Sequence, residues 1–275
     1  MPQTRKSEAP AASAAPRVLE RRQRVQSAEI GMAVLKTLAG MGGSATLSAL
    51  SAQLGESPAK VHRYLASLIQ EGLVDQEAGS QRYFLGPELI GIGLVAMRQA
   101  EPIRLAEPAL VRLREGLEVT CFVALMGNKG PTIMRIEEPG LPVTVNVRAG
   151  TVMSLVWSAT GRVFLGLLDE ARVRTLAEEE LAAATPEMLA LLPRPNPIER
   201  LQKDVRAAGC AVVRDVYLRG ISAVAAPVYD FTGRVCAVIT ALGATGGFDA
   251  SADGAIATAV LHEARATSAK LGYAP

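Results

Sequence analysis

The stretch TLSALSAQLGESPAKVHRYLASLIQEGLVDQEAGSQRYFL, residues 46–85, constrains the fold most, because it orders two short helices, a tight turn and a hairpin. The first helix has one apolar stripe, formed by Leu47, Leu50 and Leu54. Gly55 follows it, where a left-handed residue can end a helix. Pro58 suits the first turn of the second helix, and we expect Ser57 to cap that helix through its hydroxyl. Gly72, directly after Glu71, is expected to end the second helix.

The second helix has two chemically different faces. Its core-facing stripe consists of Val61, Leu65, Leu68 and Ile69. At 100° per residue, Arg63 points almost directly away from that stripe. The outer face also carries Ala59, Lys60, Ser67 and Gln70, with His62 and Tyr64 on its flanks. Cationic, amide and hydroxyl groups on one face are what a recognition helix offers to the major groove.

The segments 73–76 and 81–85 flank the loop EAGS, whose Gly79 tolerates positive φ, so we expect a hairpin wing. Arg82 on this wing is placed to meet a phosphate or the minor groove. The order of elements predicts a winged helix-turn-helix that binds duplex DNA. The predicted DNA-binding residues are Ser57, Ala59, Lys60, His62, Arg63, Tyr64, Ser67 and Arg82. The alternative is a generic three-helix packing unit with solvated charges, and His62 taken alone favours a structural role.

The distribution of charge and the spacing of the cysteines limit the functions that this chain can have. Residues 1–86 hold ten Lys and Arg against seven Asp and Glu, and the remainder holds nineteen against twenty. This asymmetry has the direction expected for a DNA-binding module on a neutral regulatory domain, although it is small. The three cysteines are far apart and only two histidines could join them, so we expect no metal and no cofactor. Without a transmembrane run or signal sequence, we expect a cytoplasmic protein with no membrane partner.

Residues 1–24 are rich in Ala, Pro, Ser, Arg and Glu, and this composition predicts a disordered tail. A helix from about Ser27 completes the DNA-binding domain, 25–86. A linker helix at 87–99 then carries apolar residues around nearly its whole circumference: Leu89, Ile90, Ile92, Leu94, Val95 and Met97. Such a helix needs burial on several sides, which predicts a dimer. The alternative is that it docks on its own second domain.

The remaining residues, 100–272, mix helices with strands. We expect helices at 101–117, 158–168, 169–180, 196–208 and 251–270, with Asn196 as a cap. We expect strands at 119–126, 132–137, 143–147, 211–216, 221–229 and 234–242. Strands grouped at both ends, with helices between them, predict an α+β domain built on one antiparallel sheet.

Several motifs resemble the isocitrate-lyase-regulator (IclR) family of bacterial transcription factors. They are SPAKVHRYLASLIQEGLV, then QRYFLGPELIGIG, then GTVMSLVWSATGRVFLGLL, and last VRAAGCAVVRDVYLRGISAVAAPVYDFTGRVCAVITALG. The resemblance covers about residues 25–270. It implies an N-terminal winged helix-turn-helix joined by a linker helix to a GAF-like effector-binding domain, in a homodimer or homotetramer on palindromic operators. Ala59 and Lys60 depart from the Ser-Thr that the family commonly has, and Trp157 stands where a His is frequent.

The resemblance also implies an effector site, between the loop before the second domain's first central helix and the later strands. The predicted residues are Trp157, Ser158, Ala159, Thr160, Val213, Asp215, Ala223, Thr240 and Leu242. For Asp215 the alternative is a strand-end carboxylate. This largely apolar set favours a larger or more apolar ligand than a small acid. Arg135, Arg148 or Arg162 could pair with a ligand carboxylate at the edge, whereas Arg162 could equally be a solvated helix residue.

We therefore predict a ligand-responsive transcriptional repressor or activator, controlling a catabolic operon for a small organic or aromatic acid. One alternative is a constitutive DNA-binding protein whose second domain only oligomerises. The other is an enzyme built on the GAF-like domain. The sequence offers no nucleophile beside a base, no P-loop and no dinucleotide-binding glycine motif, so a non-enzyme is predicted.

Overall fold

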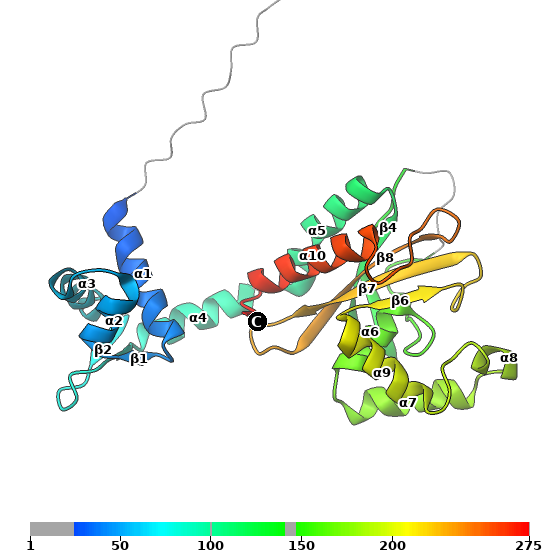
Figure 1. Cartoon of the computed structure of the whole chain (residues 1–275), viewed down its shortest axis with the longest axis horizontal. Coiled ribbons are helices and arrows are strands. Elements are labelled where there is room, and N and C mark those ends of the chain that lie inside the picture. Colours follow the sequence, from blue (N-terminus) through cyan, green and yellow to red (C-terminus); the bar gives the residue numbers. More distant parts are fainter. Residues whose placement is uncertain (1–24, 100, 141–146, 275) are drawn as a thin grey trace, which may run out of the picture. The chain divides into compact units, whose positions relative to one another are not determined.

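A computed structural model describes residues 25–99, 101–140 and 147–274. The chain divides between Leu94 and Val95 into two compact units, each of which has its own elements (Figure 1). The predicted tail and most of the predicted strand 143–147 lie outside the described residues.

The first unit is a three-helix domain with a small antiparallel sheet. Its elements are α1 (Gln26–Gly40), β1 (Ser44–Ala45), α2 (Leu47–Leu54), α3 (Pro58–Gln70), β2 (Val74–Gln76) and β3 (Tyr83–Leu85). The strands follow the order β1-β3-β2. Val34, Leu38, Leu50, Leu65 and Tyr83 are buried together in its core. The three helices and the wing hairpin occur in the predicted order, while the two-residue strand β1 was not predicted.

The helix ends in this unit follow local rules with one exception. Gly55 after α2 and Gly72 after α3 both have left-handed backbones, with φ of 66° and 68°. The predicted Ser57 cap is wrong, because the Ser57 side chain makes no capping hydrogen bond. Its carbonyl oxygen instead accepts from the backbone N–H groups of Lys60 (3.0 Å) and Val61 (3.1 Å). Pro58 removes one of the N–H groups that need a partner at this end.

Helix α4 (Glu88–Gln99) follows the wing and contains the division between the two units. It is an apolar helix with little burial in the single chain. The exposed fractions of its large apolar side chains are 67% for Ile90, 57% for Ile92, 49% for Leu94 and 54% for Val95. Such a surface is costly to leave in water.

The second unit is an α+β domain on a five-stranded antiparallel sheet. Its strands are β4 (Thr120–Gly127), β5 (Gly130–Glu137), β6 (Ala211–Arg214), β7 (Ile221–Tyr229) and β8 (Val235–Ala244), in the order β5-β4-β8-β7-β6. Its helices are α5 (Pro102–Leu117), α6 (Ala159–Leu167), α7 (Ala171–Ala182), α8 (Pro186–Leu189), α9 (Pro197–Ala208) and α10 (Ala255–Lys270). The predicted fold class is confirmed, and only the short helix α8 was not predicted.

Asn196 occupies the predicted N-cap position of α9, but its side chain does not cap the helix. Its backbone is left-handed, with φ of 56°, and its side chain makes no capping hydrogen bond to α9. A capping side chain normally reaches the first-turn N–H groups from an extended backbone. The Asn196 carbonyl accepts from the Arg200 N–H instead, at 3.1 Å.

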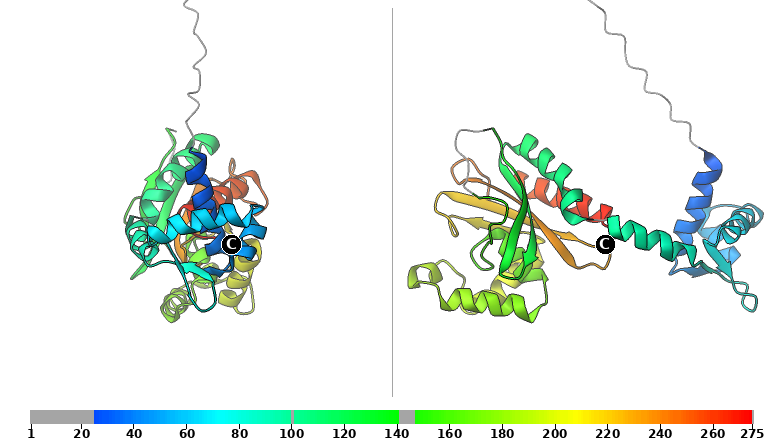
Figure 2. Two further views of the ribbon diagram at one scale, coloured as in Figure 1. Left: turned by 90° about the vertical axis from the view of Figure 1, so that its left-hand side faces the viewer. Right: turned by 180° about the vertical axis from the view of Figure 1, so that it is seen from behind.

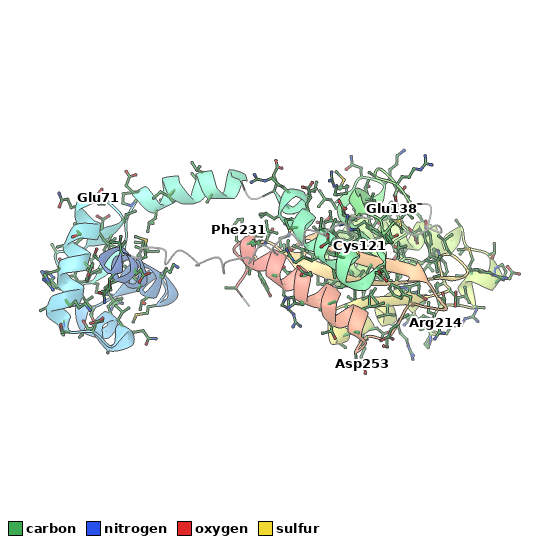
Figure 3. All side chains as sticks on the ribbon, turned by 90° about the horizontal axis from the view of Figure 1, so that it is seen from above. Glu71, Cys121, Glu138, Arg214, Phe231 and Asp253 are labelled. Atoms are coloured by element: carbon green, nitrogen blue, oxygen red, sulfur yellow. The ribbon has the colours of Figure 1, made fainter. Side chains whose placement is uncertain are left out.

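Helices cover both faces of the sheet (Figure 2). The face covered by α5 and α10 buries Cys121, Val123 and Ile239, whereas α6, α7 and α9 cover part of the other face. Side chains fill the space between these layers, with Cys121 inside and Asp253 outside, before α10 (Figure 3). Because neighbouring strand residues point to opposite faces, Phe122 lies on the side opposite to Cys121. This second face contains a cavity.

Candidate nucleic-acid interface and ligand cavity

The outer face of α3 is exposed where the sequence pattern predicts it. Val61, Leu65 and Leu68 are buried, while Ala59, His62, Arg63, Ser67 and Gln70 are exposed. Tyr64, predicted on the flank, is half-buried against the domain core. The structure therefore brings most predicted DNA-binding residues of α3 onto one accessible surface.

Three polar contacts restrain the residues around this face. Lys60 Nζ lies 2.7 Å from Oε1 of Glu56, which lies in the turn between α2 and α3. His62 Nδ1 lies 3.3 Å from the hydroxyl of the buried Tyr83, which joins α3 to the wing. Arg82 donates from Nε to Ser44 Oγ (2.9 Å) and from a terminal nitrogen to the Ser44 carbonyl (3.2 Å).

Arg63 differs from these residues. Within the described ranges, its guanidinium has no hydrogen-bond or ion-pair partner. A guanidinium presents five donors in a planar fork that matches the O6 and N7 atoms of guanine or a phosphate. The free side chain on the outward face of α3 is therefore available for a duplex. The role of Glu56 was not predicted, because it lies in the turn before α3, where helical periodicity carries no signal.

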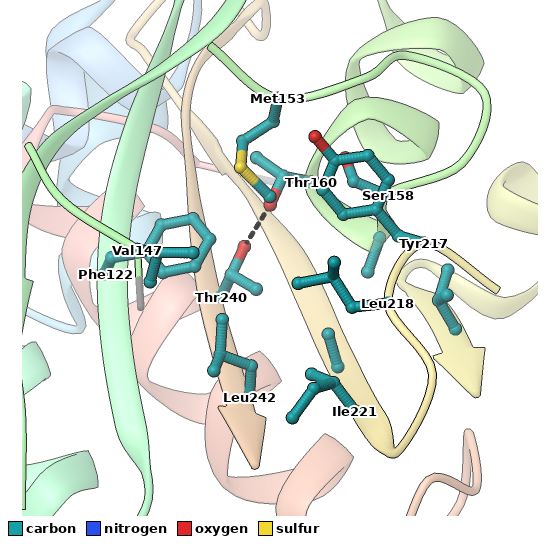
Figure 4. Close-up of a pocket in the computed structure, with 13 residues that line it drawn as sticks. Phe122, Val147, Met153, Ser158, Thr160, Tyr217, Leu218, Ile221, Thr240 and Leu242 are labelled. Carbon is teal, nitrogen blue, oxygen red and sulfur yellow. Dashed lines mark hydrogen bonds between the residues drawn. The ribbon is translucent and has the colours of Figure 1, made fainter. Parts of the chain in front are cut away.

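The second unit contains a small, partly open space that we call the sheet cavity, between the sheet and the start of α6 (Figure 4). Its volume is about 30 Å³, well below the roughly 150 Å³ of an engineered cavity that binds benzene. It is lined by Phe122, Val147, Met153, Ser158, Ala159, Thr160, Val213, Tyr217, Leu218, Ile221, Ala223, Thr240 and Leu242. No charged side chain belongs to this lining, so the sheet cavity is an apolar site with a few hydroxyl groups.

The polar atoms of the sheet cavity gather at the start of α6. Thr160 Oγ1 and Thr240 Oγ1 lie 2.8 Å apart, and both residues are buried. This pair has one proton between the two oxygens and leaves one further hydroxyl proton for another acceptor. Ser158 caps the helix by accepting from the Gly161 N–H at 2.9 Å. The first turn of α6 also presents backbone N–H groups and the positive end of the helix dipole.

Seven of the nine predicted effector residues line the sheet cavity: Ser158, Ala159, Thr160, Val213, Ala223, Thr240 and Leu242. Trp157 lies elsewhere, 4% exposed in the core formed with α6, α7 and α9. Asp215 also lies outside the lining. One of its carboxylate oxygens accepts from the Gly220 N–H and from Thr245 Oγ1, both at 2.8 Å, and so fixes the loop between β6 and β7.

The lining residues that were not predicted come from strands β4 and β7, from the loop between β6 and β7 and from the segments before α6, and Ile221 is the first residue of β7. Phe122 is paired with Thr240 across β4 and β8, so strand register would have identified it. Tyr217 and Leu218 belong to the loop between β6 and β7, where periodicity carries no signal. Met153 and Val147 precede α6 in segments without a named strand or helix.

The three candidate arginines do not line the sheet cavity. Arg135 is half exposed and lies within 4 Å of Glu107 and Glu137, at 3.8 and 3.6 Å. Arg148 is exposed. Arg162 donates from Nε to the Val156 carbonyl at 2.8 Å, and burial lowers its pKa to about 10. The alternative that Arg162 is a solvated residue on the helix surface is therefore wrong, because its side chain is largely removed from water.

In the described parts of the chain, no group of three or more His, Cys, Asp or Glu side chains is arranged to hold a metal ion. None of the helices described combines the length and apolar character that crossing a bilayer requires.

Comparison with known families decides the identity. Residues 27–78 match the IclR helix-turn-helix domain, and residues 95–269 match the C-terminal domain of bacterial IclR transcriptional regulators. The chain belongs to the IclR family. It is accordingly a DNA-binding transcriptional regulator, as the similar IclR proteins are.

The IclR relatives match over most of their length. The crystal structure of Pseudomonas aeruginosa HmgR is 38% identical, with a TM-score of 0.82, covering 90% of this chain and 99% of that one. The regulator BhcR of Paracoccus denitrificans is 25% identical over 84% of this chain and 81% of its own length. The glycerol operon regulatory protein of Streptomyces coelicolor is 29% identical over 75% of this chain and 80% of its own.

Proposed function

We propose that this IclR-family protein is a ligand-responsive regulator that binds a palindromic operator as a homodimer or homotetramer. Its operon serves the catabolism of a small organic or aromatic acid. The DNA-binding part of the proposal rests on the outward face of α3, where Arg63 has no partner among the residues that the structure describes. Relatives named for the glycerol operon and the Pca regulon support a role in catabolic control.

The DNA contacts follow from the geometry of α3 and the wing. Arg63, with Ala59 and Ser67 beside it, meets base edges in the major groove. Lys60 and Arg82 contact phosphates, after exchanging the polar partners that they hold in the free protein. His62 acts at the border of the surface, because its ring is held to the wing.

Self-association through α4 is the second part of the proposal. Its exposed apolar residues need a partner, and a second copy of α4 supplies a surface with the same character.

Ile92→Glu and Leu94→Glu are expected to raise the dimer dissociation constant at least about tenfold, because a carboxylate would have to enter an apolar interface. Sedimentation velocity over a concentration series measures this change. Met32→Glu is the matched control, since Met32 is also an exposed apolar helix residue but lies on α1. An unchanged oligomer in both α4 variants would place the contact elsewhere.

Effector binding in the sheet cavity is the third part of the proposal. The lining matches an apolar ligand body in its chemistry, and the Thr160–Thr240 pair supplies a hydrogen bond. A ligand carboxylate would accept hydrogen bonds from the backbone N–H groups that begin α6. A bound effector changes operator affinity only through its differential binding to two DNA-binding arrangements of the protein.

The small volume of the sheet cavity favours a rival reading, a constitutive regulator whose second unit only oligomerises. A thermal-shift screen of organic and aromatic acids, followed by operator binding with each stabilising acid, separates the two. The proposal requires at least one acid that raises the melting temperature and changes operator affinity. Stabilisation by none of them, with operator binding intact, favours the constitutive regulator.

Thr240→Val is expected to weaken the response to such an effector about tenfold in concentration, because a ligand hydrogen bond is lost and Thr160 keeps an unpaired hydroxyl. Operator affinity without ligand should equal that of wild type, since the change lies in the second unit. Thr120→Val is the control, a buried threonine on β4 outside the lining. A full response in Thr240→Val at unchanged effector concentration would remove the sheet cavity from the sensing site.

A further inference from the structure

We propose that Glu180 on α7 is a positioning residue that holds the entrance of the sheet cavity closed. The inference rests on the proposed function in one respect, namely that the sheet cavity receives the effector. Glu180 does not line the cavity. It acts through the segment 154–158, whose neighbours Met153 and Ala159 are both lining residues.

The carboxylate of Glu180 accepts hydrogen bonds from three donors of this segment. Its oxygens accept from Ser154 Oγ at 2.5 Å, from the Leu155 N–H at 2.8 Å and from the Val156 N–H at 3.1 Å. Hydrogen bonds to an ionised acceptor are about twice as strong as neutral ones. The partners are separated from Glu180 by more than twenty residues, so the contact joins α7 to the segment before α6.

Other backbone N–H and C=O groups of this segment pair with side chains and not with a neighbouring strand. Ser154 Oγ accepts from the N–H groups of Val156 (3.2 Å) and Trp157 (2.9 Å), while it donates to Glu180. On the carbonyl side, Arg162 Nε donates to Val156 at 2.8 Å. A segment held in this way can be released by removing one side chain, which is untrue of a strand inside a sheet.

The charge of the same carboxylate also affects the pKa of Tyr217, which is another lining residue. Tyr217 lies in the loop between β6 and β7 and contributes to the lining, with 39% of its surface exposed (Figure 4). Burial raises the pKa of its phenol, the charge of Glu180 raises it further, and the Ser154 backbone N–H opposes both. The charge of Glu180 therefore reaches the Tyr217 hydroxyl, while the hydrogen bonds of Glu180 go to the segment 154–158.

The small volume of the sheet cavity makes the position of the segment 154–158 important for ligand entry. A space of about 30 Å³ cannot hold an aromatic ring, so a wall must move when a ligand enters. Strands β4, β7 and β8 are paired on both sides and cannot open without breaking the sheet. The segment 154–158 and the Tyr217 loop are among the walls that lie outside the sheet, and the Glu180 hydrogen bonds restrain the first of them.

The test uses the full-length, ligand-free protein and the variants Glu180→Ala and Glu180→Gln. Glu179→Gln is the matched control, because Glu179 is the exposed neighbour on the same helix. Hydrogen exchange at the Leu155 and Val156 amides should become about tenfold faster in Glu180→Ala, as expected for the loss of a charge-assisted hydrogen bond. Glu180→Gln retains one acceptor oxygen and should give a smaller increase, which is rescue by the conservative variant.

Two optical readouts report the entrance itself. Trp157 is the single tryptophan of the chain and is 4% exposed, so acrylamide should quench it weakly in wild type and several-fold more in Glu180→Ala. The dye 8-anilinonaphthalene-1-sulfonate should bind Glu180→Ala and Tyr217→Ala, whose apolar linings are opened, but not Glu179→Gln. Exchange at Val224 and Ile239, inside the sheet, should stay at the wild-type rate and shows that the domain remains folded.

Unchanged exchange at Leu155 and Val156 in Glu180→Ala would overturn the proposal. Equally accelerated exchange at Val224 and Ile239 in both Glu180 variants would also overturn it, because Glu180 would then stabilise the whole domain. No effector takes part in these measurements. They can fail while effector binding is demonstrated, and effector binding can fail while they succeed.

Discussion

Arg63→Ala should weaken specific operator binding by about 5- to 150-fold per protomer, the equivalent of about 1–3 kcal/mol for one major-groove base contact. The melting temperature should stay at the wild-type value. The reason for both expectations is the same: Arg63 is exposed on α3, opposite the buried Val61 and Leu65. Titration of a labelled operator, together with a thermal melt of the same preparation, measures the two effects.

Two variants serve as controls for this prediction. Arg63→Lys keeps the charge but loses the planar fork, so it should discriminate poorly between operator and unrelated DNA. Lys36→Ala removes one exposed cation from α1 and should affect both duplexes alike and weakly. If Arg63→Ala melts early and binds the operator normally once folded, α3 does not present this face to DNA.

Gly161→Ala should destabilise the second unit by about 3 kcal/mol, at the upper end of the usual cost of overpacking. A Cβ on Gly161 would overlap the Ser154 carbonyl oxygen and the Leu155 Cα, which belong to the backbone and cannot rotate away. The segment 154–158 must therefore shift away from α6. For a unit of this size, the melting temperature should fall by about 6–12 °C.

Gly116→Ala is the matched control, because Gly116 lies on α5 with nothing within 4 Å of an added Cβ. Alanine favours a helix over glycine by about 1 kcal/mol, so this control should melt at or above the wild-type temperature. Calorimetry resolves the transition of each unit in both variants. A Gly161→Ala protein as stable as wild type would show that α6 and the segment before it are not in close contact.

The winged helix-turn-helix could be predicted from the sequence because its signals are local. The apolar stripe of α3 and the glycines at 55 and 72 act within one or two turns of the backbone. Capping was less predictable. Ser57 and Asn196 are of the right residue type, yet whether their side chains reach the helix depends on backbone angles that residue type does not determine.

The cavity was predictable only in part, for a different reason. Thr240 and Leu242 alternate along one strand, so predicting β8 also predicts that they share a face. Trp157 adjoins the cavity residues in sequence but turns into the neighbouring core, which only packing decides. Glu180 is separated from its partners by the whole of α6 and most of α7, and no pattern within a helix reveals such a contact.

Selection of binding sites from a random duplex library tests the central claim most directly. The full-length protein is used at about 0.15 M salt, because affinity for DNA depends steeply on salt. The account predicts that wild type enriches one pseudo-palindromic sequence, with two half-sites about one or two helical turns apart, and that Arg63→Ala does not enrich it. Enrichment of no sequence by wild type, or of the same sequence to the same extent by Arg63→Ala, would contradict the account.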